Sequence, residues 1–466
     1  MRIYALYEDL GQAIKNCAQL CTLASVRYCV RSLHCGNALS TNYLSTASRL
    51  RRLGWFAAIS FLLLLSIPTA NLLVIRPLQE GTLLFYQMKD GPLRVADFVP
   101  FYYAAKAGTS EVRLQSYDYD VRMKLSNELV SPHRVGEPFY CGYLPIVFVL
   151  MAPLAPFGLV SGYYIWCIAS LIFGVGMLGI WLRRETTASW RLALTFCLLA
   201  LWSLPSVLCF RLGQVSWLLV AAYVAFFIGL FRSKDLLPAI MLALSTVKPQ
   251  YTAVIMCSAL GLRRFRLLLL AIGIELALFA LATVQIGWSN ILRYPSLLHH
   301  TEFSDGAATV MVSIRSYLYA VAGSDVGLKI NFVLLVLAMI ALTILWRQAV
   351  TYDRFTQRWL AALTVVTALV VSPHTHVHDD LLLALAAALT LKIPTERPIT
   401  INKWLSSAWY GLICTFAFLG YYFYSWPSIG HMSRWPLLVI NLLIWMVGIV
   451  IYVSLVRRKT PANAEE

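Results

Sequence analysis

Long apolar runs separated by short polar segments are the dominant pattern of this chain. A helix needs about 20 apolar residues to span the hydrocarbon core of a bilayer. Eight runs have about this length, at 53–75, 161–182, 190–210, 212–231, 266–286, 327–346, 403–424 and 435–456. We expect each of them to cross a membrane as a helix, which predicts an all-α polytopic membrane protein.

Four shorter apolar runs form two predicted hairpins. The first pairs 236–248 with 250–262, and the second pairs 358–371 with 380–392. Each run would give a helix of roughly 20 Å, which is shorter than the hydrocarbon core. We therefore expect the polar tips of both hairpins to lie in a protein-lined cavity below the membrane surface.

Two further apolar runs fit a membrane-crossing helix poorly. Residues 144–157 are interrupted by Pro153 and Pro156, and 307–323 contain Arg315. We interpret the first run as re-entrant and the second as non-spanning, which leaves about 12 crossings in total. The alternative for the first run is that Arg183 and Arg184 lie outside, which would shift the count of crossings.

The composition excludes a water-soluble fold, because 59% of the residues are hydrophobic and only 13% are charged. Soluble domains carry roughly a quarter charged residues. The net charge of +16 would suggest a nucleic-acid partner in a soluble protein. Here 24 of the 38 Lys and Arg residues fall in loops of one face. Because such loops stay in the cytoplasm, the excess is topological and nucleic acid is not an expected partner.

This topology divides the chain into four parts, with both termini in the cytoplasm. Residues 1–52 form a cytoplasmic leader, and 53–392 form a membrane core with a large first outer loop at 76–143. C-terminal transmembrane helices follow within 393–456, before a cytoplasmic tail at 457–466.

The outer loop is much longer than a usual connection. It contains eight basic residues, eight acidic residues, several aromatic residues and two helix-like stretches at 97–108 and 118–130. We expect a folded cap that lies on the membrane. We expect most of its Tyr and Phe side chains to be anchors at the membrane interface.

Three short polar clusters lie on the same predicted face, at 211–214, 247–250 and 372–380. Ionisable residues at membrane depth are costly and mark a functional site by default. In the second cluster, Lys248 could simply extend its ammonium group to the membrane surface, but that role does not require a short hairpin.

The third cluster holds three histidines beside two aspartates: His374, His376, His378, Asp379 and Asp380. These residue types suit a divalent metal, but a hydrogen-bonded cluster explains them as well. We assign no metal to them.

Acids and bases gathered under one folded outer loop suggest chemistry on a lipid-borne substrate. A transporter would more often show internal repeats and a midplane site between broken helices. The two halves of the chain show no convincing self-similarity. A lipid-linked sugar flippase or transporter, or a non-catalytic subunit of an envelope-assembly complex, is the alternative.

The outer motifs occur in a definite order along the chain. They are Asp-Phe-Val-Pro-Phe-Tyr-Tyr-Ala-Ala at 97–105, Tyr-Asp at 117–118, Tyr-Leu-Pro at 143–145, Gly-Gln at 213–214, Lys-Pro-Gln at 248–250, Ser-Pro at 372–373 and His-Asp at 378–379. This set resembles glycosyltransferase family 87 over residues 55–390. Two positions depart from the family pattern: this chain has Tyr-Leu-Pro where the family usually has Tyr-X-Pro-Pro, and Asp380 replaces the aromatic residue that follows His-Asp.

The resemblance implies an integral-membrane enzyme with a GT-C-like fold. It implies a polyprenyl-phosphate sugar donor, usually of mannose, and inversion at the anomeric carbon, so that a β-linked donor gives an α-linked product. The acceptor would be a glycolipid or glycan outside the plasma (inner) membrane. Another sugar on the same carrier, such as a pentose or glucose, is an alternative. We expect no cofactor and no partners beyond the donor, the acceptor and membrane lipids.

A sugar on a lipid phosphate already has a good leaving group, so the acceptor hydroxyl mainly needs a base. We expect Asp97 to be this base, since its counterpart opens the first outer loop in the family, and Asp118 is the next candidate. The alternative role of Asp97 is to cap the helix that begins near Phe98.

The departing phosphate needs cations that are already in place. Lys248 fits this role best, with Arg211 and Arg315 as helpers. We expect the spans after residue 400 to shape a groove for the polyprenyl tail.

The remaining expected substrate-binding residues are polar or aromatic. Gln214, His378 and Asp379 would hydrogen-bond sugar hydroxyls or hold the hairpin tip, and Tyr143 opens the Tyr-Leu-Pro motif.

Overall fold

The structure is a computed structural model, and it describes residues 67, 84–87, 93–139, 142–186, 188–302, 308–391, 403–424 and 434–457. These residues are almost entirely helical, with one short antiparallel hairpin of β1 (Phe85–Gln87) and β2 (Leu93–Val95). The predicted leader, the first predicted span except Ile67, and the C-terminal tail except Arg457 lie outside the described residues.

Four described helices are long and apolar enough to cross a membrane: α7 (Leu159–Glu185), α13 (Phe265–Ile286), α17 (Ser324–Gln348) and α22 (Trp435–Arg457). They coincide with four of the predicted spans. Their outer faces expose large apolar side chains, including Val284 and Ile172, as contact with lipid allows. The chain is therefore a helical membrane protein, while the total of about 12 crossings stays a prediction.

The predicted span 190–210 is a bent pair of helices. α8 (Trp190–Trp202) and α9 (Leu204–Leu212) meet at an angle of 58°. Pro205 stands in the first turn of α9, where its missing N–H breaks no helical hydrogen bond, whereas α8 could not continue through it.

Both predicted hairpins are present. The first consists of α11 (Leu236–Leu244), the 3-10 turn η4 (Ser245–Val247) and α12 (Pro249–Gly261). The second consists of α18 (Arg354–Val371), the 3-10 turn η6 (Val377–Leu381) and α19 (Leu382–Thr390). The two hairpins pack together through α12 and α18.

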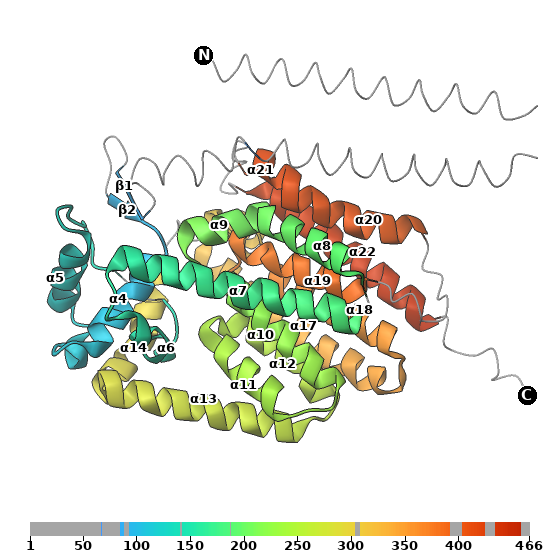
Figure 1. The fold of residues 1–466 in the computed structure, drawn as a ribbon, viewed down its shortest axis with the longest axis horizontal. Coiled ribbons are helices and arrows are strands. Elements are labelled where there is room, and N and C mark those ends of the chain that lie inside the picture. Colours follow the sequence, from blue (N-terminus) through green and yellow to red (C-terminus); the bar gives the residue numbers. More distant parts are fainter. Residues whose placement is uncertain are drawn as a thin grey trace, which may run out of the picture. The chain divides into compact units, whose positions relative to one another are not determined.

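Helices α18 and α10 (Ser216–Phe231) are deeply buried, with nearly every residue of each covered. α18 packs against α12, α19 and α22, and α10 packs against α7 and α11 (Figure 1). A helix that is apolar all round is stable where neighbours cover every face. With 16 residues, α10 is shorter than the span predicted at 212–231.

The outer loop contains α4 (Phe98–Thr109) and α5 (Tyr119–Val130), close to the helix-like stretches predicted there. The aromatic residues of α4 are packing residues and not interfacial anchors, because Phe98, Phe101, Tyr102 and Tyr103 are all buried. They lie against neighbours that include α6 (Ile146–Met151) and α7. With six residues, α6 is too short to cross a bilayer.

The remaining elements are short or peripheral. The helices are α14 (Trp288–Glu302), α16 (Ile314–Ala322), α20 (Lys403–Cys414) and α21 (Gly420–Phe423), and the short turns are η2 (Arg113–Gln115), η3 (Ala152–Leu154), η5 (Ala349–Thr351) and η7 (Thr415–Leu419), the last of π type.

Candidate active site

Asp97 directly precedes α4, at the position where a capping residue would stand. Its side chain makes no capping hydrogen bond. Instead, Oδ2 of Asp97 accepts a hydrogen bond of 2.7 Å from Nε2 of Gln214, on the loop after α9. The capping alternative therefore does not describe this carboxylate, which is directed away from its own helix.

Gly213 brings Gln214 to Asp97. α9 ends at this glycine in a left-handed conformation with φ +68°, which a residue with a Cβ adopts only with strain. A Cβ at this position would also lie 2.5 Å from Cβ of Phe98. The Gly-Gln motif thus combines the turn that glycine permits with a close approach of α9 to the start of α4.

Tyr143 extends this contact into a chain of three side chains. Its hydroxyl donates to Oε1 of Gln214 at 3.1 Å, so the amide accepts from Tyr143 and donates to Asp97. With both ends engaged, the amide has one favoured orientation. No described residue bonds the second oxygen of Asp97, Oδ1, which leaves that atom to meet a substrate.

The surroundings of Asp97 weaken its acidity. Burial raises the pKa of Asp97 above the usual range of a carboxyl group, while the hydrogen bond from Gln214 and the charge of Lys248 offset part of that rise. A carboxylate whose pKa is raised is a better proton acceptor than an exposed aspartate.

Lys248 lies at the tip of the first hairpin, between η4 and α12. Pro249 starts α12, which ends the preceding turn and fixes the backbone at the tip. The ammonium Nζ of Lys248 contacts Oδ1 of Asp379 at 2.6 Å, and both side chains are almost completely buried. Lys248 is therefore held by a buried ion pair and does not extend to the membrane surface.

Asp379, on η6 of the second hairpin, accepts hydrogen bonds at both oxygens. Oδ1 also accepts from the hydroxyl of Ser216 at 3.0 Å, and Oδ2 accepts from the hydroxyl of Tyr251 at 2.9 Å and the backbone N–H of His376 at 3.2 Å. Burial alone would raise the pKa of Asp379, but Lys248 and His378 outweigh it and hold that pKa well below the usual range. Asp379 is therefore an anion that positions Lys248.

The tip of the second hairpin is held from several sides. Arg315 of α16 is buried and donates to the carbonyl of Pro373 at 2.8 Å. The hydroxyl of Tyr251 donates to the carbonyl of His374 at 3.1 Å. Asn441 of α22 donates to Oδ1 of the buried Asp380 at 3.0 Å. These contacts attach the tip to α16, α12 and α22.

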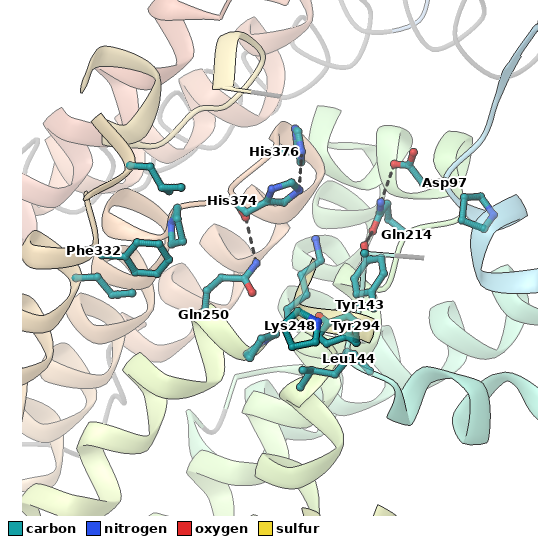
Figure 2. Close-up of a pocket in the computed structure, with 18 of the residues that line it drawn as sticks. Asp97, Tyr143, Leu144, Gln214, Lys248, Gln250, Tyr294, Phe332, His374 and His376 are labelled. Carbon is teal, nitrogen blue, oxygen red and sulfur yellow. Dashed lines mark hydrogen bonds between the residues drawn. The ribbon is translucent and has the colours of Figure 1, made fainter. Parts of the chain in front are cut away.

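These residues surround a cavity of about 770 Å³. One part of its lining is polar and comprises Asp97, Tyr143, Gln214, Lys248, Gln250, His374 and His376. Another part is apolar and includes Leu144, Val247, Pro295, Leu328, Phe332 and Leu335. Figure 2 shows Phe332 on the other side of the cavity from Asp97, with Lys248 and Gln250 between them. A cavity of this kind suits a ligand with a polar head and an apolar tail.

The structure brings four of the predicted site residues to this cavity: Asp97, Tyr143, Gln214 and Lys248. Two more, His378 and Asp379, are buried next to Lys248 and do not line it; Nε2 of His378 lies 3.6 Å from Oδ1 of Asp379. Their contacts assign them to support of the hairpin tip.

The other three predicted residues do not line the cavity. Arg315 supports the tip from behind, and Arg211 is a half-buried residue at the end of α9. Asp118 precedes α5, is partly exposed and forms an ion pair with Arg293 of α14.

Sequence reasoning did not assign substrate contact to several residues of the lining, among them Gln250, His374, Lys329 and Phe332. Gln250 belongs to the Lys-Pro-Gln motif, so its place in the site could have been predicted from that motif. Lys329 lies within the predicted span 327–346, where an ionisable residue was also a usable signal, whereas Phe332 does not differ in pattern from its apolar neighbours.

The histidines of the second hairpin lie close together, with Nε2 of His374 and Nε2 of His376 3.1 Å apart. Among the described residues, no group of three or more His, Cys, Asp or Glu side chains is arranged to hold a metal ion. The short distance between the two nitrogens fits a hydrogen bond, which one ring donates and the other accepts.

The family comparison agrees with this arrangement of motifs. The sequence model of glycosyltransferase family 87 matches residues 140–373, which is just over half of the chain. The chain belongs to glycosyltransferase family 87. No curated protein matches it significantly. The match contains Tyr143, Gln214 and Lys248, whereas Asp97 precedes it. Membership confirms the resemblance and makes the chain a multi-pass membrane glycosyltransferase.

Proposed function

We propose that this glycosyltransferase moves a hexose, most readily mannose, from a polyprenyl-phosphate carrier to a hydroxyl of an extracytoplasmic glycolipid or glycan. The observation that carries the proposal is the cavity itself, where Asp97 and Lys248 line the same space beside an apolar wall. One site thus offers a proton acceptor, a cation and a surface for a lipid tail.

Asp97 is the proposed general base. The acceptor oxygen attacks the anomeric carbon and forms the new glycosidic bond, while its proton passes to Oδ1 of Asp97. The bond from the anomeric carbon to the phosphate oxygen breaks, and its electron pair leaves on the lipid phosphate. Attack opposite the leaving group inverts the anomeric carbon, so a β-linked donor gives an α-linked product. Base catalysis of this kind contributes roughly 10²–10⁴-fold.

Lys248 is the proposed first cation for the leaving phosphate. Its ammonium is held in place by Asp379 at 2.6 Å, so little reorganisation is needed when negative charge develops. Gln250 and His374 line the cavity next to it and offer polar groups to the sugar or the phosphate.

The apolar wall is the proposed path of the polyprenyl tail. It includes Leu328, Phe332 and Leu335 of α17, a helix that also exposes apolar side chains to lipid. No described residue after His376 lines the cavity. We therefore assign the start of the tail to α17, and not to the spans after residue 400 as the sequence suggested.

The distribution of basic residues supports an extracytoplasmic site in the plasma membrane. The loops rich in Lys and Arg mark the cytoplasmic face. The two hairpin tips and the outer loop fall on the opposite face under this rule.

The decisive experiment measures sugar transfer by the purified enzyme from synthetic polyprenyl-phosphate mannose, with Asp97→Asn in parallel. We expect turnover by the natural enzyme and a loss of about 10²-fold or more in the variant. Turnover only with a glucose or pentose donor would replace mannose in the proposal. Absence of transfer from every donor, with movement of the lipid-linked sugar across vesicles, would replace catalysis with transport.

A further inference from the structure

Lys329 is a second cation of the cavity, and it differs from Lys248 in its surroundings. It lies in the second turn of α17 and lines the cavity with Leu328 and Phe332 of the same helix. Its Nζ contacts Oδ2 of Asp325, one turn earlier, at 2.6 Å, and its side chain is 71% exposed. An exposed pair of this spacing is weak, so the ammonium can leave Asp325 at little cost.

Lys248 alone does not give the inner part of the cavity enough positive charge to neutralise a phosphate. Lys248 is already neutralised by the buried Asp379, and Asp97 adds another carboxyl group to the lining. His376 is held neutral, because burial and the neighbouring His374 and His378 lower its pKa well below the usual range. The inner part of the cavity therefore has little net positive charge.

The proposed reaction increases the negative charge of the lipid phosphate. The donor is a phosphodiester with one negative charge, and the leaving group is a phosphomonoester that carries nearly two at neutral pH. The second charge develops as the bond to the sugar breaks. A cation that contacts this group therefore stabilises the transition state more than the ground state.

We propose that Lys329 binds the lipid phosphate of the donor and neutralises the charge that this group gains on departure. This inference rests on the proposed function. When the donor enters, the ammonium exchanges Asp325 for a phosphate oxygen, while Lys248 contacts the phosphate from the hairpin tip. Lys329 is thus a substrate-binding residue that selects a charged lipid over an uncharged one.

The spacing of the lining residues along α17 sets the direction in which the lipid tail would run along this helix. Phe332 and Leu335 lie three and six positions beyond Lys329, which corresponds to about 4.5 and 9 Å along a helix. With the phosphate at Lys329, the first isoprene units would pass Phe332 and then Leu335. The polar head and the apolar tail would then meet neighbouring positions of one helix.

The kinetic test compares Lys329→Gln and Lys329→Arg with Lys124→Gln, a change of an exposed lysine on α5 that does not line the cavity. We expect Lys329→Gln to raise the KM for the donor about tenfold and to lower kcat as well. Lys329→Arg should retain most activity, and Lys124→Gln should behave like the natural enzyme. Asp325→Asn, which removes the competing carboxylate, should lower the KM.

A binding test separates this inference from the proposed function. Polyprenyl phosphate, the polyprenyl alcohol and inorganic phosphate are each titrated into the purified enzyme and into Lys329→Gln. We expect the substitution to weaken only polyprenyl phosphate, and to remove the preference for it over the alcohol. Equal affinities in both proteins would overturn the role of Lys329, even if the enzyme transfers sugar. A contact with inorganic phosphate alone would show an anion site that does not serve the lipid.

Discussion

Nε2 of Gln214 donates a hydrogen bond of 2.7 Å to Oδ2 of Asp97, across a separation of 117 residues. The same amide accepts from Tyr143. Three motifs that are far apart in the chain thus form one hydrogen-bonded chain beside the cavity. The carboxylate is oriented by neighbours from two other segments, and its remaining oxygen is left for chemistry.

Asp97 and Asp118, the two candidate bases of the outer loop, should respond very differently to substitution by asparagine. Asp97→Asn removes the proposed proton acceptor, so we expect kcat to fall by about 10²–10⁴-fold. Asp118→Asn is the matched control, because Asp118 pairs with Arg293 and does not line the cavity. Its kcat should stay within about twofold, since surface pairs contribute little. Equal losses in both variants would contradict the assignment of the base.

The hydrogen bond from Gln214 should be visible in the pH dependence of catalysis. It favours the charged form of Asp97 and lowers a pKa that burial has raised. Gln214→Leu removes it, so the pKa of Asp97 should rise further. Because the base acts when deprotonated, the acid limb of kcat/KM should move to higher pH. Tyr143→Phe should cause a smaller shift in the same direction. An unchanged limb in Gln214→Leu would exclude Asp97 as the titrating base.

The ion pair between Lys248 and Asp379 should make a large contribution to stability. Lys248→Met leaves a buried carboxylate without its cation, and we expect unfolding to become about 3–5 kcal/mol easier. Lys248→Met combined with Asp379→Asn should recover part of this loss. Thermal unfolding of the purified variants in detergent measures both effects. A double variant less stable than Lys248→Met would show that Asp379 has a separate stabilising role.

The same pair should be insensitive to mild acid. The pKa of Asp379 is lower in the folded protein than in the unfolded chain, so its contribution is complete above the unfolded value of about 4. It is lost only as the pH falls through the folded value. The difference in stability between the natural enzyme and the double variant Lys248→Met with Asp379→Asn, which lacks both charges, should therefore be constant from about pH 5 to 8. A steep decline over this range would contradict a permanently ionised Asp379.

Gly213 should not tolerate a side chain. Gly213→Ala places a Cβ at φ +68° and 2.5 Å from Cβ of Phe98. We expect a destabilisation of about 1–3 kcal/mol and a loss of activity, because α4 and Asp97 must shift. Gly176→Ala, where a Cβ meets nothing within 4 Å, is the control and should be neutral or slightly stabilising. Unchanged kinetics in Gly213→Ala would argue against a need for this close approach.

The local features of this fold could be predicted because they depend on neighbouring residues. The apolar runs indicated α7, α13, α17 and α22, and the short runs indicated both hairpins. The bend between α8 and α9 was missed, although Pro205 lies within the run. A hydrophobic run specifies that a segment prefers lipid or a protein interior, but it does not specify that the segment is straight.

Sequence alone established a helical membrane protein, the likeness to glycosyltransferase family 87, and a set of polar residues that converge. These conclusions depend on hydrophobic length, charge asymmetry and motif order, all of which are properties of the linear chain. Only the tertiary structure distinguished Asp97 from Asp118, paired Lys248 with Asp379, and brought Lys329 to the cavity. Those relationships depend on how helices pack, because packing decides which distant side chains meet and which lose their contact with water.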